Sequence, residues 1–375
     1  MRYSLFSDEA IFMLASIAPG SHLVQQLLEA LQALPGVDAD LSQLEPAGAS
    51  SVPRQDADID IRIAAKALTL HVEARKTIYP RDVQQLLWRM KSLAGRSPGS
   101  DIDLVPVVAA ESLSPGAKEL LRAEHVGYFD SGGSLYLPTP GAYVYIDKPP
   151  PKAQASAMRS LFTGRRAQVV HTLLMQREHW FGVKDLAERS QVSPATASGV
   201  LSELEKFDWI ESRGQGPSKE RHLHDARALL DAWAGQVTAS RPQMLRRYFV
   251  PGLKSEALVD RLAHAFEARD AAYAVTHEAA AQRYAPFLTA VSQVRCRVLA
   301  APKAGDALVD LGARAVDDGA NFAIIEVKSP GDLLFSERVG NAWLASPIHV
   351  YLDLLKGEGR SREMAEHLRK ERIGF

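Results

Sequence analysis

The sequence has one cysteine, Cys296, and almost no net charge. A single cysteine excludes a disulfide framework within the chain and a cysteine-rich zinc finger. The 44 Lys and Arg residues are balanced by 45 Asp and Glu residues, which gives a formal net charge of −1. This balance excludes a global positive field that would hold the chain to nucleic acid. Any nucleic-acid binding therefore needs a local basic patch.

Long hydrophobic runs are also missing. We find no run of about 18 apolar residues, the length that a membrane-spanning helix requires. The stretch Met1–Gly20 has only Arg2 as a basic residue and carries Asp8 and Glu9 among its apolar residues. This pattern is unlike a signal peptide. We therefore expect a cytoplasmic protein with no membrane partner, which agrees with the single cysteine.

The length and the breaks in the chain indicate several domains. At roughly 150 residues per domain, 375 residues correspond to two or three domains, and 46% hydrophobic residues can supply each with a core. Three consecutive prolines at 149–151 favour an extended connector, and a softer break lies at Ser240-Arg241-Pro242. The sequence therefore predicts domains at 1–148, 153–240 and 241–375.

The first segment mixes helical and strand periodicities. Residues 58–63 and 68–73 alternate apolar and polar side chains, which predicts a β-hairpin. The other expected elements are helices at 11–34, 83–93 and 115–124 and strands at 104–108, 126–129 and 135–137. This order predicts an α/β or α+β domain with a mixed sheet.

The middle segment has the pattern of three short helices. Apolar positions in 169–174 predict the first helix, and residues 183–189 predict the second. Ser193 suits the N-cap of a third helix, and Pro194 suits its first turn, where a missing N–H costs nothing.

The third helix has two unlike faces. Apolar side chains that we expect to pack on the first two helices are Ala197, Val200, Leu201 and Leu204. Gly199 lies on the opposite face with small polar residues. A helix that enters a DNA major groove needs such a face. The expected DNA-binding residues of this helix are Ser193, Thr196, Ser198 and Ser202.

A basic hairpin follows the third helix. Residues 209–213 and 219–223 predict two strands, joined by a turn at 214–217. From Arg213 to His224 the hairpin has three basic residues, Arg213, Lys219 and Arg221, against one acid, so we expect them to contact phosphate. The segment resembles the winged helix-turn-helix of bacterial transcription regulators over about 70 residues. The alternative is a winged helix that binds protein.

The first-segment hairpin has a second interpretation. Restriction-type nucleases place an acid on one strand and an acid-x-Lys triplet on the next, where the carboxylates hold Mg²⁺. Here Asp58 or Asp60 would be the first acid and Glu73 the second, but Arg75 stands at the lysine position. Arginine is charged at ordinary pH and cannot accept a proton. The segment resembles the restriction-endonuclease-like core without its activity.

Under that interpretation we expect no catalytic residue, no metal site and no cofactor. The alternative is a Mg²⁺-dependent nuclease that uses Asp58, Asp60, Glu73 and Arg75. Alternating acids on a hairpin are also found on ordinary solvated strands. A second acid-x-Lys triplet, Glu326-Val327-Lys328, is interpreted as a surface-facing strand end because Ser329-Pro330-Gly331 follows it directly.

The third segment carries a family resemblance. It predicts strands at 294–299 and 322–327 and helices at 255–269, 304–311, 345–355 and 361–372. The tract from Tyr273 through Ser346-Pro347 to Tyr351-Leu352-Asp353-Leu354-Leu355, behind the winged helix, resembles AbiEi-type antitoxins of type IV toxin–antitoxin systems. Residues 241–375 would form the antitoxin-like α/β domain, and residues 1–148 would be an additional N-terminal domain.

The resemblance implies a transcriptional repressor that binds inverted repeats in double-stranded DNA through its winged helix, and it is compatible with a homodimer. It also implies a nucleotidyltransferase-like toxin as a partner. We expect this chain not to be that enzyme, because it lacks a Gly-Ser followed by an Asp-x-Asp pair for nucleotide and metal.

Other interpretations remain open. The C-terminal motif is also explained by helix packing, with Val350, Leu354 and Leu355 in a core and with Tyr351 and Asp353 paired locally. For the whole chain, the alternatives to a DNA-binding regulator are the nuclease described above and a protein-interaction adaptor.

Overall fold

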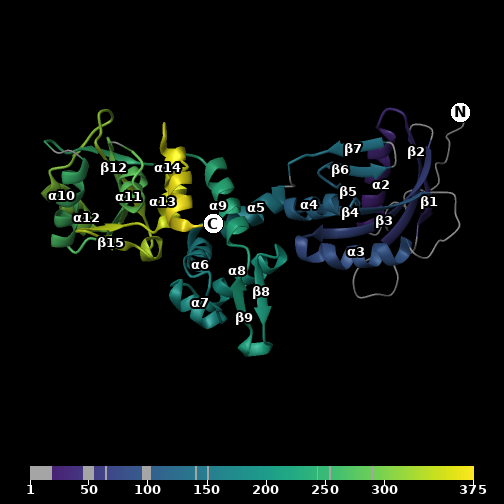
Figure 1. The fold of residues 1–375 in the computed structure, drawn as a ribbon, viewed down its shortest axis with the longest axis horizontal. Helices are drawn as coiled ribbons and strands as arrows, with labels where there is room; N and C mark the ends of the chain where they lie inside the picture. The colour runs from purple at the N-terminus through teal and green to yellow at the C-terminus, as the bar shows by residue number, and fades with distance from the viewer. Residues whose placement is uncertain are drawn as a thin grey trace, which may run out of the picture. The chain divides into compact units, whose positions relative to one another are not determined.

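The computed structural model describes residues 19–44, 55–63, 66–94, 103–139, 142–149, 152–242, 244–252, 255–288 and 290–375 (Figure 1). The chain divides into two compact units. Unit 1 comprises Met1–Met158 with Lys206–Asp208, and unit 2 comprises Arg159–Glu205 with Trp209–Phe375. Each unit contains helices and a seven-stranded sheet, so the predicted mixed α/β class is confirmed.

Unit 1 is built on one sheet whose strands follow the chain order from β1 to β7. Its elements are α2 (Pro19–Gln32), β1 (Val37–Leu44), β2 (Gln55–Ile63), β3 (Lys66–Ile78), α3 (Pro80–Ala94), β4 (Asp103–Leu113), α4 (Pro115–Ala123), β5 (Gly127–Asp130), β6 (Leu135–Thr139), β7 (Ala142–Ile146) and α5 (Lys152–Leu161). Strands β1 to β3 are antiparallel, β3 to β5 are parallel, and β5 to β7 are again antiparallel.

The sheet of unit 1 has a core on each face. On one face, leucines of α2 such as Leu27 and Leu31 pack with Ile59 and Leu70 of β2 and β3. The other face has a second core with contributions from α3, α4 and strands β3 to β6. The alternation of residues 58–63 and 68–73 thus places isoleucine and leucine toward α2 and leaves the acids on the side of α3.

Several expected boundaries in unit 1 need correction. The expected helix at 11–34 corresponds to α2, which ends at Gln32 because Pro35 and the left-handed Gly36 (φ 76°) follow. Residues 11–18 lie outside the described residues, as do Pro150 and Pro151 of the expected connector. Strands β1 and β7 and helix α5 were not predicted.

Unit 2 begins with helices and a hairpin and continues into its sheet. Its elements after α5 are α6 (Gly164–Met175), α7 (Val183–Arg189), α8 (Pro194–Lys206), β8 (Ile210–Arg213), β9 (Glu220–Leu223), α9 (Ala226–Ala239), β10 (Arg246–Phe249), α10 (Ser255–Ala268), β11 (Tyr273–Thr276), α11 (His277–Tyr284), β12 (Val294–Leu299), α12 (Pro302–Leu311), β13 (Arg314–Ala315), β14 (Phe322–Val327), β15 (Glu337–Val339), β16 (Ala342–Leu344), α13 (Pro347–Leu354) and α14 (Ser361–Leu368). Short helical turns lie at Gly216–Ser218, Pro330–Leu333 and Arg369–Ile373.

The sheet of unit 2 has the strand order β13-β10-β14-β12-β11-β16-β15. Strand β12 runs parallel to β14 and antiparallel to β11, so the sheet is mixed. Helix α10 packs against α12, whereas α11, α13 and α14 pack together, and α13 also contacts α6. Strands β12 and β14 occupy the ranges predicted from the sequence.

Two further expectations concern the whole chain. No helix in the described parts of the chain is long and apolar enough to cross a membrane. The predicted boundary near residue 150 lies close to the division between the two units. The boundary at residue 240 falls inside unit 2, and the three-domain division stays a prediction.

Candidate nucleic-acid interface

Helix α8 begins as its sequence predicts. The Ser193 hydroxyl oxygen accepts a hydrogen bond from the backbone N–H of Thr196 at 3.2 Å, which is an N-cap bond. Pro194 is the first residue of the helix. The cap therefore fixes where the helix starts and which way its first turn faces.

The division of α8 into two faces is confirmed. Its buried side chains are Ala197, Val200, Leu201 and Leu204, each 0% exposed. Thr196 and Ser198 are half-buried, and Ser202 is exposed. A Cβ built on Gly199 would meet no atom within 4 Å, so this face is open as well as polar. The four residues expected to bind DNA thus lie along the cap and the open face of one helix.

The hairpin after α8 is formed by β8 and β9, with Arg213 opposite Glu220. The backbone of Phe181 bonds to that of Arg221 in both directions, at 2.8 and 2.9 Å, and extends the hairpin by one bridge. The expected turn contains a short helical turn at Gly216–Ser218. Gly214 has φ of 75°, and a Cβ there would lie 2.8 Å from the Ser218 carbonyl oxygen, so the turn requires glycine.

Arg213 is the most exposed of the three predicted phosphate-binding residues. Its side chain is 56% exposed, and its guanidinium lies 4.1 Å from the centre of the Trp180 ring. Trp180 also stacks on His222, with ring centres 5.0 Å apart. An ion pair with Glu220 at 2.8 Å completes the set of contacts. Surface ion pairs of this kind are weak, so Arg213 can exchange its partner for a phosphate.

Lys219 and Arg221 instead share one carboxylate, that of Glu205 at the end of α8. Its Oε1 accepts hydrogen bonds from Lys219 Nζ at 2.8 Å and from Arg221 Nε at 3.1 Å. Ser212 donates to the same oxygen at 3.0 Å. Partial burial opposes ionisation of Glu205, but the hydrogen bonds from Lys219, Ser212 and Arg221 outweigh it and lower the pKa.

Glu205 belongs to the candidate interface but is not indicated by the sequence pattern. The predicted basic character rests on residues 213–224, and Glu205 lies outside that range. The Arg221 side chain is only 11% exposed, so it is poorly placed to reach a phosphate without rearrangement. The one available signal was the position of an acid at the end of α8, close in sequence to a basic hairpin.

A buried polar network joins α6 to α13. His171 of α6 hydrogen-bonds through Nε2 to the Ser346 hydroxyl at 2.7 Å, and its ring lies 3.9 Å from that of His349. The Ser346 hydroxyl oxygen also accepts from the His349 backbone N–H, which caps α13. Burial, followed by the charge of Arg297, lowers the pKa of His171 to about 3, so the imidazole is neutral near pH 7.

Asp353 has a long-range partner in place of the local one considered from the sequence. Arg297 of β12 binds both carboxylate oxygens of Asp353 at 2.7 and 2.8 Å, and Thr276 donates to one of them at 2.6 Å. Burial opposes ionisation, but the charge and hydrogen bonds of Arg297 hold the pKa of Asp353 below its usual value. Tyr351 likewise contacts a distant residue, Arg369. Val350 and Leu354 are buried, as expected for core residues, whereas Leu355 is only half-buried.

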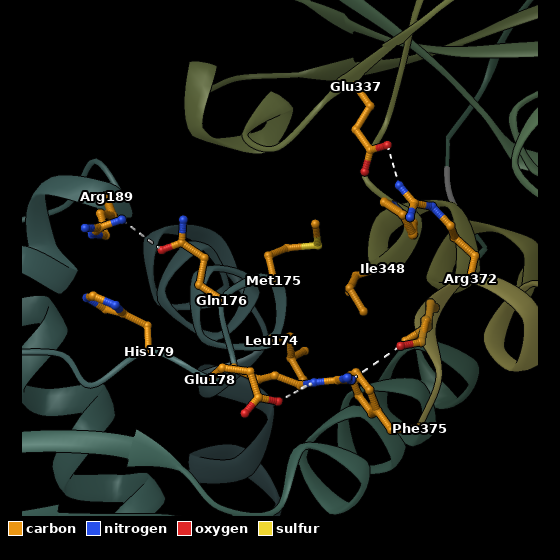
Figure 2. A pocket seen from close by; sticks show the side chains of 13 residues that line it. Leu174, Met175, Gln176, Glu178, His179, Arg189, Glu337, Ile348, Arg372 and Phe375 are labelled. Atoms are coloured by element: carbon orange, nitrogen blue, oxygen red, sulfur yellow. Dashed lines mark hydrogen bonds and ion pairs between the residues drawn. The ribbon is translucent and has the colours of Figure 1, made fainter.

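A cavity of about 610 Å³ lies beside α6 and α13 (Figure 2). Met175 and Ile348 extend toward its middle, and charged side chains surround it. Arg372 pairs with Glu337 at 2.7 Å, and Arg189 donates to Gln176 at 3.3 Å. The polar groups of this cavity are therefore largely engaged with one another.

The acids of the first-segment hairpin have partners of their own. Asp58 hydrogen-bonds to His71 at 2.8 Å, and Asp60 accepts from Thr69 at 2.6 Å. These pairs follow from the register of β2 and β3. The acids thus share one face of the sheet with Glu73.

Glu73 is 1% exposed and is held by arginines. Arg75 of the same strand and Arg89 of α3 both contact Glu73 Oε1, Arg89 at 2.6 Å. The arginine at the lysine position therefore acts as an ion-pair partner of the acid. In the second triplet, Glu326 and Lys328 are exposed, and Glu326 pairs with Arg246 at 2.8 Å, which confirms the surface-facing interpretation.

No family model and no curated protein matches the chain. One solved structure that matches is the structure of EndoMS in apo form, with 18% sequence identity and a TM-score of 0.23. The match covers 31% of this chain and 47% of the EndoMS chain, so this chain spans about half of that protein. A likeness at this level carries no argument about function.

Proposed function

We propose that the chain is a DNA-binding transcription regulator and that residues 153–240 form its winged helix-turn-helix. The observation that carries this proposal is the open polar face of α8, which the Ser193 cap orients and the buried Leu201 face anchors. Small polar side chains allow a helix backbone to approach base edges closely.

The hairpin supplies the phosphate contact in this proposal. Arg213 is exposed, and stacking on Trp180 restricts its guanidinium before DNA arrives. Less side-chain entropy is then lost on binding. Lys219 and Arg221 contribute less because both are already paired with the Glu205 carboxylate.

We further propose that residues 1–148 are a restriction-endonuclease-like domain without activity. A Mg²⁺ site needs carboxylate oxygens that are free to coordinate the ion. The Glu73 carboxylate is buried and two guanidiniums contact its Oε1, which fits an internal ion pair better than a metal ligand. The charge of Arg75 and Arg89 would also repel a cation from this position.

Residues 241–375 are proposed to be the antitoxin-like domain, with a nucleotidyltransferase-like toxin as partner. Two residues of the motif, Ser346 and Asp353, lie in the buried networks of unit 2. Asp353 supports the internal packing of residues 241–375, whereas Ser346 joins them to α6. A toxin would therefore be contacted by other, exposed residues.

DNA binding is tested by selecting duplexes from a random pool and measuring competition between a selected duplex and random DNA at fixed salt. We expect a two-fold symmetric sequence that binds at least about 10³-fold more tightly than random DNA. Thr196→Ala should reduce that discrimination by about 1 to 3 kcal/mol. Thr238→Ala is the matched control, because Thr238 is exposed on α9 and its hydroxyl donates to the Ala234 carbonyl oxygen within the same helix. Equal discrimination in parent and Thr196→Ala would remove Thr196 from the interface.

The second candidate is a Mg²⁺-dependent nuclease, favoured by the placement of Asp58, Asp60 and Glu73 on one face of a hairpin that continues into a parallel strand. Plasmid incubated with Mg²⁺ or Mn²⁺ should stay intact. Cleavage by the parent that is lost in both Asp58→Ala and Glu73→Ala would establish the nuclease. It would overturn the proposal that residues 1–148 are inactive. The Arg75→Lys variant restores the lysine that active nucleases have at this position. Nuclease activity in this variant would show that the arginine is the reason why the parent is inactive.

A further inference from the structure

A second cavity of unit 2, of about 370 Å³, lies at one end of the sheet and is not part of the proposed DNA interface. Its inner part contains His277, which is buried, and Gln293 and Arg295, which are half-buried. Arg247 of β10 and Lys356 after α13 also line it. The volume is in the range of small-ligand sites.

The strand register places the two arginines in one row. Arg247 of β10 and Arg295 of β12 both pair with Ala323 of the intervening strand β14. Directly paired residues extend from the same face of a sheet. The α-carbons of the two arginines are therefore about 10 Å apart, twice the spacing of neighbouring strands. Between them lies the small side chain of Ala323, which is fully buried.

The partners of Arg295 differ from those of Arg297, two residues along the same strand. Arg297 has a carboxylate, that of Asp353, at 2.7 and 2.8 Å. Arg295 donates to two neutral groups, Gln293 Oε1 at 2.8 Å and His277 Nδ1 at 3.2 Å. Arg247 donates to the backbone carbonyl oxygen of Asp317 at 3.4 Å. Among the described residues, neither Arg247 nor Arg295 has a carboxylate within ion-pair distance.

His277 presents a further donor. Because Nδ1 accepts from Arg295, the proton of the neutral ring is on Nε2, which has no hydrogen-bond partner among the described residues. Burial lowers the pKa of His277 to about 4, so the neutral ring is the form present near pH 7. Its backbone has φ of 53°, an unusual conformation for a residue other than glycine. Such conformations persist where the surrounding structure holds the side chain in place.

The outer part of the cavity is acidic, whereas its inner part is basic. Asp317, Asp318 and Glu358 line it, and all three are exposed. A ligand would therefore place an anionic group inside, near Arg295 and His277, and hydrogen-bond donors outside, near the acids. A molecule with several carboxylates would be repelled by the acids, whereas one phosphate on a hydroxyl-bearing body satisfies both ends.

We propose that this cavity binds a small phosphorylated molecule with several hydroxyl groups, and that Arg247, Arg295 and His277 hold its phosphate. The cavity is too small for a long stretch of polymer, so nucleic acid is not the proposed ligand. This binding is separate from operator recognition and can be measured in the absence of DNA.

The test is calorimetric titration of the full chain with ribose 5-phosphate at constant ionic strength, with ribose and citrate as comparison ligands. We expect saturable binding of ribose 5-phosphate only. Arg295→Gln should weaken it about tenfold or more, since it removes a charged hydrogen-bond donor. Arg314→Gln is the matched control, because Arg314 is exposed on β13 and does not line the cavity.

Arg247→Gln is a second test variant, used in case Arg295→Gln does not fold. Arg247 is exposed and should tolerate substitution. It should weaken binding as well. The proposal is overturned by the absence of saturable binding up to about 10 mM ribose 5-phosphate. Tighter binding of citrate, or equal affinity in the parent and both lining variants, would overturn it too.

Discussion

Replacing Glu205 by glutamine isolates the role of this carboxylate in the basic hairpin. In the parent, Glu205 is ionised near neutral pH and forms ion pairs with both Lys219 and Arg221. Glutamine keeps an acceptor for Ser212 but removes the charge. Each cation that gains a phosphate contact adds about 0.9 to the slope of log affinity against log salt concentration. We therefore expect the slope of Glu205→Gln to be steeper than that of the parent by about 1 to 2 units.

The same substitution should lower the free energy of unfolding while it strengthens DNA binding. Charge-assisted hydrogen bonds each contribute about 1.5 to 3 kcal/mol, and glutamine replaces them by weaker ones. The free energy of unfolding should therefore fall by about 1 to 3 kcal/mol. If Glu205→Gln binds DNA more tightly although it is less stable, the gain comes from the release of Lys219 and Arg221. A more stable fold could not explain it.

The assay is fluorescence anisotropy of a labelled random duplex over a series of KCl concentrations, with urea unfolding in parallel. Glu363→Gln is the control, because it changes net charge by the same amount at an exposed site on α14. A long-range effect of net charge would shift both variants equally. If the Glu205→Gln slope equals that of the parent, Lys219 and Arg221 do not reach phosphate when released, and the reasoning fails.

Three further predictions concern unit 2. Arg213→Ala should weaken binding to all DNA sequences alike and reduce the salt slope by about 1, which anisotropy would measure; an unchanged slope would remove the hairpin from the interface. Leu201→Ala should lower the free energy of unfolding by about 2 to 5 kcal/mol, because it leaves a cavity under α8; a change within about 0.5 kcal/mol in urea unfolding would contradict the assigned packing. The folded-state pKa of His171, about 3, is below the unfolded value of about 6.5, so the unfolded chain binds more protons between these pH values. Stability should therefore fall as pH drops from about 6.5, by at most about 1.4 kcal/mol per unit from this residue, and His171→Gln should reduce that dependence in unfolding experiments at pH 7 and 5.5.

Elements with a strong local signal were predictable from the sequence. Ser193-Pro194 marks the start of α8 because a capping hydroxyl and a proline favour the same position. The ends of β12 and β14 were also predictable, because each strand coincides with a short apolar run. Strand β1 was missed although it alternates, because a register irregularity between Leu41 and Gln43 interrupts the pattern.

The charge state of each candidate site was not predictable, because it depends on residues distant in the sequence. Arg89 reaches Glu73 only after α3 folds back over the sheet. The pairing of Glu205 with Lys219 and Arg221 requires α8 and the hairpin to be in place. Local composition reports which charges are present but not which of them are paired.

The same distinction applies to the break at Ser240-Arg241-Pro242. Local backbone preferences favour a boundary there, yet the helices before it and the sheet after it lie in one compact unit. Two long-range hydrogen bonds from α6 contribute to this: His171 bonds to Ser346, and Gln168 donates to the Ser329 hydroxyl at 3.0 Å. Buried polar contacts are costly to separate, because each group would lose its partner before water could replace it. A proline-containing break therefore identifies where the chain changes direction, and the contacts across it decide whether the two sides can move independently.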